Sequence, residues 1–508
     1  MATAVATAAV AAALLLAGTA PVAGRAAVRA PRHVVLLGID GLGGDWVANA
    51  SAPTLHALAA NGTSTLAMQN VLGTSSSQNW FAMISGTGPD QNGVYTNLWR
   101  RPRNDSALPP TIFATWRAQR PNATIGLIHE WAGFGRLVED NVCDLKVSPG
   151  DYEATTDAAV AYLRSDRPDL LMVVWDLVDH AGHDYGWGSP EYYAAIATAD
   201  GLVRRVLDAL ADAGMLDETA VIVSADHGGN ARGKHGADQL PLRSVPFLAA
   251  GAGVWVGRSV AREVRIFDIA PTVAELAGLA RPAAWIGTPV YEAVQGGLPP
   301  PTPPSPAPLD VALTTEYTLL YNSTGEPSGF VEVHSVWRPV APAGYATLGD
   351  VAVRGLAAPT FATPVVRDVA DLVAPPAAFE RVWTNEEFAS YSTPVTYWSP
   401  IPSYGYVCLG SHAATSLPSE REPPRDALRC VLAPYARAAA AGGVAVVRNA
   451  GFTHLENGWA VSLWEADGAP DGGALATHSF LARRDLHGPG YPKLYWLQPD
   501  PAAAARAA

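Results

Sequence analysis

Three apolar runs in the first half of the chain lead directly into acidic or imidazole side chains. They are His33–Asp40, Asp169–Leu177 and Thr219–Ala225. Apolar runs of this length that are rich in β-branched residues are typical of buried strands. The ligand crevice of an open α/β sheet lies outside the carboxyl ends of its strands. We therefore expect the polar side chains that follow these runs to lie at one edge of one sheet.

The segments between and after these runs follow helix and strand patterns. Ala52–Gly62 predicts a short helix that ends at its glycine, and Pro190–Gly214 predicts a long amphipathic helix. Val245–Gly251 predicts a further strand, and Asp268–Gly278 predicts a helix capped by its aspartate. This alternation predicts an α/β domain with a mainly parallel sheet sandwiched by helices.

Carboxylate and imidazole groups gather after the predicted strands. Asp179-His-Ala-Gly-His183 follows the second run, Asp226-His-Gly-Gly-Asn-Ala-Arg-Gly-Lys-His235 follows the third, and Asp40 ends the first. A single Asp or His there is more often a cap or a surface residue, but three strands that end alike indicate a metal site. Mixed Asp and His ligands suit zinc, and manganese or iron less selectively, whereas calcium prefers oxygen ligands. The candidate ligands are Asp40, Asp179, His183, Asp226, His227 and His235.

The second half of the chain has a different character. Residues 299–308 are mostly proline, which predicts an extended spacer. Beyond it, short aromatic strands and Gly/Pro turns indicate a β-rich domain. Trp337-x-Pro339, Gly344-Tyr345 and Leu348-Gly349 recur 61 residues later, starting at Trp398. We interpret this repeat as aromatic packing under glycine turns rather than as a binding site. The predicted organisation is 1–27 signal peptide, 33–295 α/β domain, 296–309 linker and 310–500 β-rich domain.

Composition and charge limit the class of protein. The 508 residues are 49% hydrophobic and 16% charged, as in a globular chain, and the net charge of −13 argues against a broad nucleic-acid-binding surface. The apolar N-terminus resembles a secretory signal, and no other segment is apolar for long enough to span a membrane. Of three cysteines, Cys143, Cys408 and Cys430, the last two could pair. A secreted or lumenal glycoprotein would fit the sequons at Asn49, Asn61, Asn104, Asn122 and Asn322.

A serine-rich loop, Gly73-Thr-Ser-Ser-Ser-Gln-Asn79, precedes the apolar stretch Trp80–Gly86. A hydroxyl at a helix N-terminus faces free backbone N–H groups and the positive end of the helix dipole, which favour an alkoxide and an incoming phosphate. Taken alone, ordinary helix capping explains these serines better.

The ordered motifs resemble the alkaline phosphatase superfamily, in particular its nucleotide pyrophosphatase/phosphodiesterase branch, over about residues 33–295. That branch places a Thr/Ser nucleophile two residues before a Pro-Asn pair, which here is Gln78-Asn79. The resemblance implies Ser76 as the nucleophile, with Ser75 and Ser77 as neighbouring alternatives. It also implies that Asn97, which ends the string Gly86-Thr-Gly-Pro-Asp-Gln-Asn-Gly-Val-Tyr-Thr-Asn97, donates a hydrogen bond to a phosphate oxygen.

The same resemblance implies two divalent cations, zinc or alternatively manganese or magnesium, that clamp a small phosphoester substrate. Ser76 would attack phosphorus, and water would then hydrolyse a phospho-serine intermediate. Asp176 and His180 stay outside the implied ligand sets because the glycine before His183 fits the family spacing. The implied sets are Asp40, Ser76, Asp226 and His227 for one ion, and Asp179, His183 and His235 for the other.

The C-terminal repeat resembles the vacuolar protein sorting-associated protein 62 family over roughly residues 310–500, which implies no chemistry and leaves its partner open. Two other functions remain open: a phosphomonoesterase on the same site, and a binding protein led by the β-rich domain with a vestigial hydrolase site. A mutase is a further member of the superfamily, although the signal sequence argues against central metabolism. A sulfatase is disfavoured because no Cys/Ser-x-Pro-x-Arg string is present.

Overall fold

The computed structural model describes most of the N-terminal half of the chain and the strands of the C-terminal half. The described residues are 30–102, 108–236, 240–299, 301, 308–324, 333–367, 369, 371–386, 393–415, 421–439, 445–448, 461–466, 474–483 and 494–501. The expected signal peptide, the sequon at Asn104 and residues 300 and 302–307 of the proline-rich linker lie outside these residues.

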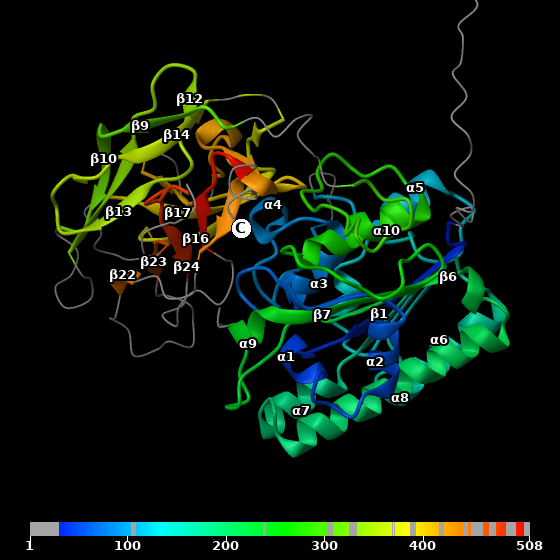
Figure 1. Cartoon of the computed structure of the whole chain (residues 1–508). Coiled ribbons are helices and arrows are strands. Elements are labelled where there is room, and N and C mark those ends of the chain that lie inside the picture. The colour runs from blue at the N-terminus through cyan, green and yellow to red at the C-terminus, as the bar shows by residue number, and fades with distance from the viewer. Residues whose placement is uncertain are drawn as a thin grey trace, which may run out of the picture.

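A mainly parallel sheet forms the centre of the N-terminal half (Figure 1). Its strands lie in the order β4 (Leu145–Val147), β3 (Ile125–His129), β5 (Leu170–Trp175), β1 (His33–Ile39), β6 (Thr219–Ser224), β7 (Ser244–Gly251), β2 (Gly62–Gln69) and β8 (Arg258–Ser259). The first five are mutually parallel, whereas β7 is antiparallel to both of its neighbours. Strand β1 lies between β5 and β6, with Gly38 opposite both Val174 and Ser224, so these three strands end together.

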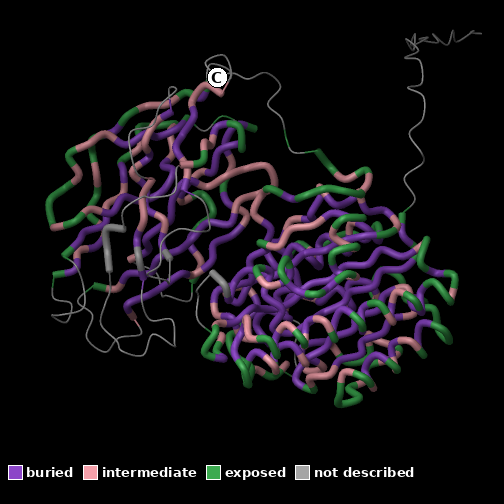
Figure 2. The backbone as a smooth tube through the Cα atoms, turned by 60° about the horizontal axis from the view of Figure 1, so that its bottom comes forward, coloured by how far each residue is buried: buried purple, intermediate pink, exposed green. Residues whose placement is uncertain are grey.

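Helices cover both faces of this sheet (Figure 1). One face carries α2 (Pro53–Ala60), α6 (Tyr152–Ser165), α7 (Leu177–Tyr185) and α8 (Pro190–Asp212), and the other carries α3 (Ser76–Ser85), α5 (Ile112–Gln119) and α10 (Ile269–Ala277). Strands β1, β5 and β6 are buried along their whole length, and Figure 2 shows the buried backbone concentrated in this layer. The predicted fold class is therefore confirmed. Among the described helices, none is both long and apolar enough to cross a membrane.

The predicted cap of α10 is wrong. Helix α10 follows Asp268, but the Asp268 side chain makes no capping hydrogen bond. Its two oxygens instead accept hydrogen bonds from the backbone N–H groups of Thr288, at 2.8 Å, and Arg265, at 3.1 Å. A 3₁₀ turn, Ile266–Asp268, runs directly into α10, so the helix does not begin from the extended backbone that a capping aspartate requires.

The C-terminal half consists of small antiparallel sheets, and the sequence repeat corresponds to a structural repeat. The sheet of β10 (Tyr317–Asn322), β11 (His334–Pro339) and β13 (Val351–Arg354) has the same order as that of β16 (Ala378–Thr384), β17 (Thr396–Ile401) and β19 (His412–Ala414). Each copy has a second sheet: β12 (Tyr345–Ala346), β14 (Thr363–Arg367) and β9 (Val311–Thr314) in the first, and β18 (Tyr406–Val407), β20 (Cys430–Leu432) and β15 (Val373–Ala374) in the second.

A third copy, which the sequence analysis missed, follows within the described residues. Its sheets are β22 (Ala445–Arg448), β23 (Ser462–Trp464) and β24 (Leu481–Arg483), and β21 (Ala436–Ala438) with β25 (Tyr495–Leu497). The copies meet in a ring of backbone hydrogen bonds: Asp350 N–H donates to Ser411 O, Ser411 N–H to Phe480 O, and Phe480 N–H to Asp350 O, at 2.9, 2.7 and 3.0 Å. A Cβ on the repeated glycine Gly410 would lie 2.3 Å from Ser479 Cβ, so close packing at this ring requires glycine.

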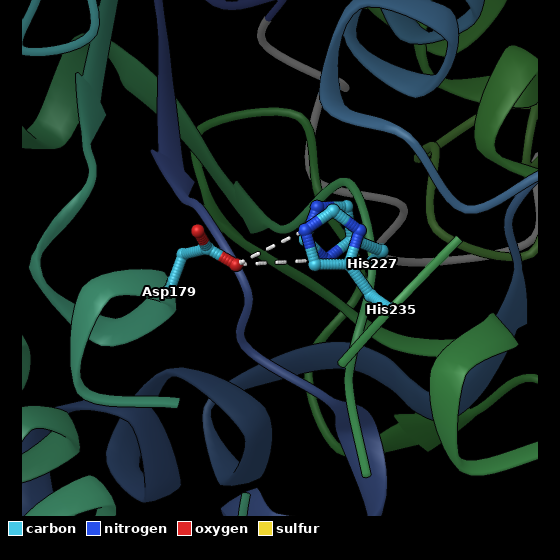
Figure 3. Close-up of side chains that lie close together, drawn as sticks. All are labelled: Asp179, His227 and His235. Atoms are coloured by element: carbon cyan, nitrogen blue, oxygen red, sulfur yellow. Dashed lines mark ion pairs between the residues drawn. The ribbon is translucent and has the colours of Figure 1, made fainter. Parts of the chain in front are cut away.

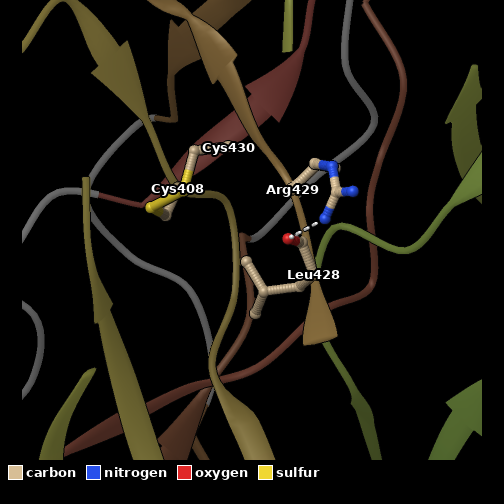
Figure 4. Close-up of a disulfide and its surroundings, with 4 residues drawn as sticks. All are labelled: Cys408, Leu428, Arg429 and Cys430. Carbon is tan, nitrogen blue, oxygen red and sulfur yellow. Dashed lines mark hydrogen bonds between the residues drawn. A yellow bond between two sulfur atoms is a disulfide. The ribbon is translucent and has the colours of Figure 1, made fainter. Parts of the chain in front are cut away.

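The cysteine pairing that the sequence left open is present. Cys408 and Cys430 form a disulfide within the second copy (Figure 4), and Cys143 is a free, half-buried thiol.

Candidate metal centre

Three aspartates reach the carboxyl edge of the sheet, each with one carboxylate oxygen lacking a partner. Asp40 follows β1, Asp226 follows β6, and Asp179 lies in the first turn of α7, after β5. Asp40 Oδ2 accepts from Trp80 Nε1–H at 3.1 Å, and Asp226 Oδ1 accepts from two backbone N–H groups at 3.2 and 2.9 Å. Asp40 Oδ1, Asp179 Oδ1 and Asp226 Oδ2 are buried without a hydrogen-bond partner among the described residues. Orphaned buried carboxylate oxygens are costly unless a cation compensates them.

Three histidines present the same ring nitrogen to these oxygens. The Nδ1 atoms of His183, His227 and His235 lie 2.9, 3.1 and 2.6 Å from backbone carbonyl oxygens, so each Nδ1–H donates to a carbonyl. In a neutral imidazole this leaves the lone pair on Nε2. Metal-ligating histidines are fixed by the same arrangement of outer hydrogen bonds.

One cluster joins Ser76 to two of the aspartates through His227. His227 Nε2 lies 3.2 Å from Asp226 Oδ2, 3.5 Å from Asp40 Oδ1 and 3.3 Å from Ser76 Oγ. Ser76 is the first residue of α3, so its hydroxyl lies at the positive end of that helix. The neighbouring Ser75 hydroxyl donates instead to Gln78 Oε1 at 3.2 Å, which separates it from this cluster.

A second cluster lies beside the first. His183 Nε2 is 3.3 Å from Asp179 Oδ2 and 3.0 Å from His235 Nε2, and His235 Nε2 is 3.9 Å from Asp179 Oδ1. The His235 ring stacks on His227 with centroids 3.8 Å apart, which links the two clusters, and Figure 3 shows Asp179 directed toward both rings. Gly41, at φ +72°, lets the backbone of Asp179 come close to the end of β1, since a Cβ on Gly41 would lie 2.6 Å from Asp179 Cα.

The electrostatics of the two clusters favour a bound cation. Burial, and then repulsion by the other carboxylates, raises the pKa of Asp40 and of Asp226 well above the ordinary range. Burial lowers the pKa of His227 and of His235 to about 3, so both rings are neutral and keep their lone pairs. The hydrogen bond to Asp179 raises the pKa of His183.

All seven ligand candidates from the sequence come together at this edge. Asp40, Asp226 and His227 form one group of potential ligand atoms within 4.8 Å of one another, and Asp179, His227 and His235 form another. Carboxylate oxygens with imidazole nitrogens, and no thiolate, are a donor set that zinc accepts and that manganese also tolerates. The orphaned oxygens and the fixed Nε2 lone pairs therefore fit divalent cations.

Asp176 is a member of the acidic group that the sequence analysis set aside. It lies with Asp40 and Asp179 in one of the potential ligand groups, and its Oδ2 pairs with His180 Nε2 at 3.1 Å. That hydrogen bond raises the pKa of His180 to about 9, although 63% of the His180 side chain is exposed. The sequence could have indicated Asp176 as a candidate ligand, because it directly follows β5 as Asp40 directly follows β1.

The loop before Ser76 is held by Gln78, which replaces the proline expected from the family. Gln78 Nε2–H donates to Leu72 O. Gly73 has φ +86°, and a Cβ there would lie 2.8 Å from Gln78 Oε1, so this tight loop requires glycine. Asn97 lies next to the loop: its Oδ1 accepts from Ser77 N–H at 2.8 Å, which leaves its amide NH₂ group as the available donor.

One family of known proteins matches the N-terminal half of the chain. A model of the type I phosphodiesterase/nucleotide pyrophosphatase family matches residues 34–133 and 108–240. Arylsulfatase K of Danio rerio is 38% identical over 92 residues, or 17% of this chain and 18% of that protein. Human ectonucleotide pyrophosphatase/phosphodiesterase family member 7 is 22% identical over 234 residues, or 42% and 51% of the two chains. The chain thus spans about half or less of these curated relatives.

Among solved structures, murine ectonucleotide pyrophosphatase/phosphodiesterase 5 in complex with AMP aligns with 49% of this chain and 96% of its own, at 16% identity and a TM-score of 0.43. A 2-O glycosaminoglycan sulfatase aligns with 64% of this chain at 16% identity and a TM-score of 0.44. The sequence match to the family model is the more specific of these findings. Over residues 34–240, the chain is similar to the type I phosphodiesterases and nucleotide pyrophosphatases.

Proposed function

We propose that the N-terminal domain, residues 33–295, is a metal-dependent hydrolase that cleaves phosphodiester or pyrophosphate bonds through a phospho-serine intermediate. The observation that carries the proposal is the position of Ser76 Oγ, 3.3 Å from His227 Nε2, at the N-terminus of α3 and within a cluster of orphaned carboxylate oxygens. The match to the phosphodiesterase family model over residues 34–240 supports it.

The residues that would hold two divalent cations are those implied by the motifs. Asp40, Ser76, Asp226 and His227 would hold one, and Asp179, His183 and His235 the other. When bound, such ions supply Lewis acidity that polarises the phosphoryl group and lowers the pKa of a nearby hydroxyl. The donor set favours zinc, with manganese or magnesium as alternatives.

Residues of the chain would carry out the nucleophilic attack and stabilise the charge that develops. Ser76 Oγ gives up its proton to solvent and forms a bond to phosphorus as the bond from phosphorus to the leaving oxygen breaks, and the leaving oxygen takes up a proton from solvent. The N-terminus of α3 stabilises the negative charge, and the Asn97 amide donates a hydrogen bond to a non-bridging phosphate oxygen. Water then attacks phosphorus, the bond from phosphorus to Ser76 Oγ breaks, and the serine regains a proton.

The remaining sequence features support a proposal for the localisation and the domain organisation of this hydrolase. We place the chain in the secretory pathway or outside the cell, with residues 1–27 as its signal peptide. The β-rich domain, residues 310–500, follows the proline-rich linker at 296–309. The substrate is a small phosphoester, and the partner of the β-rich domain stays open.

The test is hydrolysis of bis-p-nitrophenyl phosphate beside p-nitrophenyl phosphate, with and without a chelator. We expect chelator-sensitive turnover that favours the diester and is abolished in Ser76→Ala. Ser75→Ala is the matched control, since its hydroxyl contacts Gln78 rather than the clusters. Preference for the monoester would move the assignment to a phosphatase. No turnover together with no tightly bound metal would support a binding protein with a vestigial site.

A further inference from the structure

One strand of the C-terminal domain lies against the hydrolase site. Strand β16 carries Glu380, which is buried between the domains. Glu380 Oε1 accepts from Leu72 N–H at 3.2 Å, and Oε2 pairs with Arg265 Nη1 at 2.7 Å. Burial alone would raise the pKa of Glu380, but the guanidinium groups of Arg265 and Arg243 hold it below its ordinary value, so the carboxylate is charged in this contact.

Leu72 lies at the base of the loop that carries Ser76. Its N–H is held by Glu380, while its carbonyl oxygen accepts from Gln78 Nε2–H. Gln78 belongs to the first turn of α3 and also accepts from Ser75. A continuous series of hydrogen bonds therefore runs from the C-terminal domain to the residues that flank the proposed nucleophile.

The next residue of β16 contacts the segment that carries Asn97. The backbone N–H of Arg381 donates to Asp90 Oδ2 at 2.8 Å. The Arg381 side chain adds an ion pair, with Nε 3.9 Å from Asp90 Oδ1, and its guanidinium lies 5.7 Å from the centroid of the Tyr95 ring. Tyr95 O–H donates to Asp90 Oδ1 at 3.1 Å, which joins the short helix α4 (Pro89–Asn92) to the segment that follows it. Asn97 is two residues beyond Tyr95.

The internal repeat provides a comparison for these two residues. In β16, Glu380 and Arg381 lie opposite Ser399 and Trp398 of β17. In β10 of the first copy, Thr318 and Leu319 occupy the corresponding register opposite Arg338 and Trp337, and both are exposed. The acidic and basic pair therefore occurs in the copy that contacts the hydrolase domain and is absent from the equivalent strand of the first copy.

We propose that Glu380 and Arg381 are positioning residues of the hydrolase site, and that the C-terminal domain is an integral part of that site. Glu380 holds the loop of Ser76, and Arg381 holds the segment of Asn97. This inference rests on the proposed function for its effect on turnover, but the two contacts can be tested without any substrate.

Segment-specific hydrogen exchange by mass spectrometry on the full chain is the decisive test. Glu380→Ala, which removes the oxygen that accepts from Leu72 N–H, should accelerate exchange across residues 72–79 and leave 90–97 close to wild type. Arg381→Met keeps the backbone hydrogen bond to Asp90 but removes the guanidinium from Asp90 and Tyr95, and should show the reverse pattern. Thr318→Ala and Leu319→Ala, at the equivalent positions of the first copy, are the matched controls and should change neither segment. Unchanged exchange in both folded β16 variants would overturn the proposal, as would equal acceleration of both segments in each variant.

Kinetics provide the second readout. Each β16 variant should lower kcat on the order of 10- to 100-fold with little change in KM, because displaced catalytic groups slow chemistry more than they weaken binding. Asp350→Asn, which breaks the buried pair with Arg338 inside the C-terminal domain, controls for general loss of stability. Wild-type kcat in both β16 variants would overturn the positioning role. If wild type hydrolyses no phosphoester, the exchange pattern still decides whether the contacts hold the two segments.

Discussion

The Nε2 atoms of His183 and His235 lie 3.0 Å apart, while the Nδ1–H group of each ring donates to a backbone carbonyl. Burial keeps His235 neutral, so its Nε2 lone pair faces His183 Nε2, which also lies 3.3 Å from Asp179 Oδ2. Two imidazole nitrogens and one carboxylate thus offer donor atoms that a divalent cation could accept together.

Neutralising one carboxylate should have opposite effects with and without metal. The pKa of Asp226 is raised by burial and by Asp179, so the stability it contributes is present below the unfolded-state pKa and is lost as pH rises through the folded-state pKa. In chelator at pH 7, Asp226→Asn should therefore raise the free energy of unfolding. With saturating zinc, the variant should instead have a lower free energy of unfolding than the wild type. Thermal unfolding with EDTA and with zinc measures both, and a variant less stable in both conditions would contradict this.

The two histidines of α7 should differ sharply as metal ligands. His183→Ala should weaken zinc binding by more than the ~10- to 100-fold that loss of an outer hydrogen-bond partner costs, because it removes a proposed direct ligand. His180→Ala should leave the affinity close to wild type, since its side chain is largely exposed and pairs with Asp176. Competition with a chromogenic chelator compares the two. Equal losses would place His180 in the ligand set.

Asn97 should matter for turnover but not for metal content. Asn97→Ala removes the amide NH₂ donor and should lower kcat/KM by about 10²- to 10³-fold, the usual effect of losing one donor to transition-state charge. Zinc content, measured by elemental analysis, should stay unchanged. Thr96→Ala is a suitable neighbouring control. Retained kcat/KM in Asn97→Ala would show that another group supports the phosphate.

The free energy of unfolding should fall as pH rises through the pKa of Asp90. Burial raises this pKa to about 6, despite the hydrogen bond from Arg381. The folded state therefore binds the proton more tightly than the unfolded state, and stability falls as pH rises between about 4 and 6, by roughly 3 kcal/mol in total.

Asp90→Asn should remove this part of the pH dependence. Urea unfolding of wild type and variant at pH 4 and pH 7 gives the comparison, and only the difference between the two proteins is diagnostic. Parallel pH profiles for the two proteins would mean that Asp90 is already ionised at low pH.

The sequence predicted the structure best where a run of residues is compatible with only one kind of secondary structure. The aliphatic runs of β1, β5 and β6 have few alternatives to buried parallel strands, so the edge that gathers Asp40, Asp179 and Asp226 could be predicted. Asp268 was misassigned because an aspartate before a helix can bind backbone N–H groups elsewhere, as it does here with Thr288 and Arg265.

Features that depend on pairing between distant segments were beyond the sequence. Glu380 and Arg381 are ordinary strand residues until β16 is placed against the hydrolase domain. The disulfide of Cys408 and Cys430 was one of several possible thiol states. The third copy lacks the Trp-x-Pro string and has no Gly-Tyr pair at the spacing of the repeat, so strand pairing identifies it.

The ring of backbone hydrogen bonds among Asp350, Ser411 and Phe480 has a kinetic consequence. The ring joins positions that are distant in sequence. Its three hydrogen bonds can therefore form together only after all three copies have come into contact. Such topology has a high contact order and predicts slow, cooperative folding of the C-terminal half. Since β16 in the middle copy contacts the Ser76 loop, a newly made chain should acquire the proposed hydrolase activity only after this slow closure.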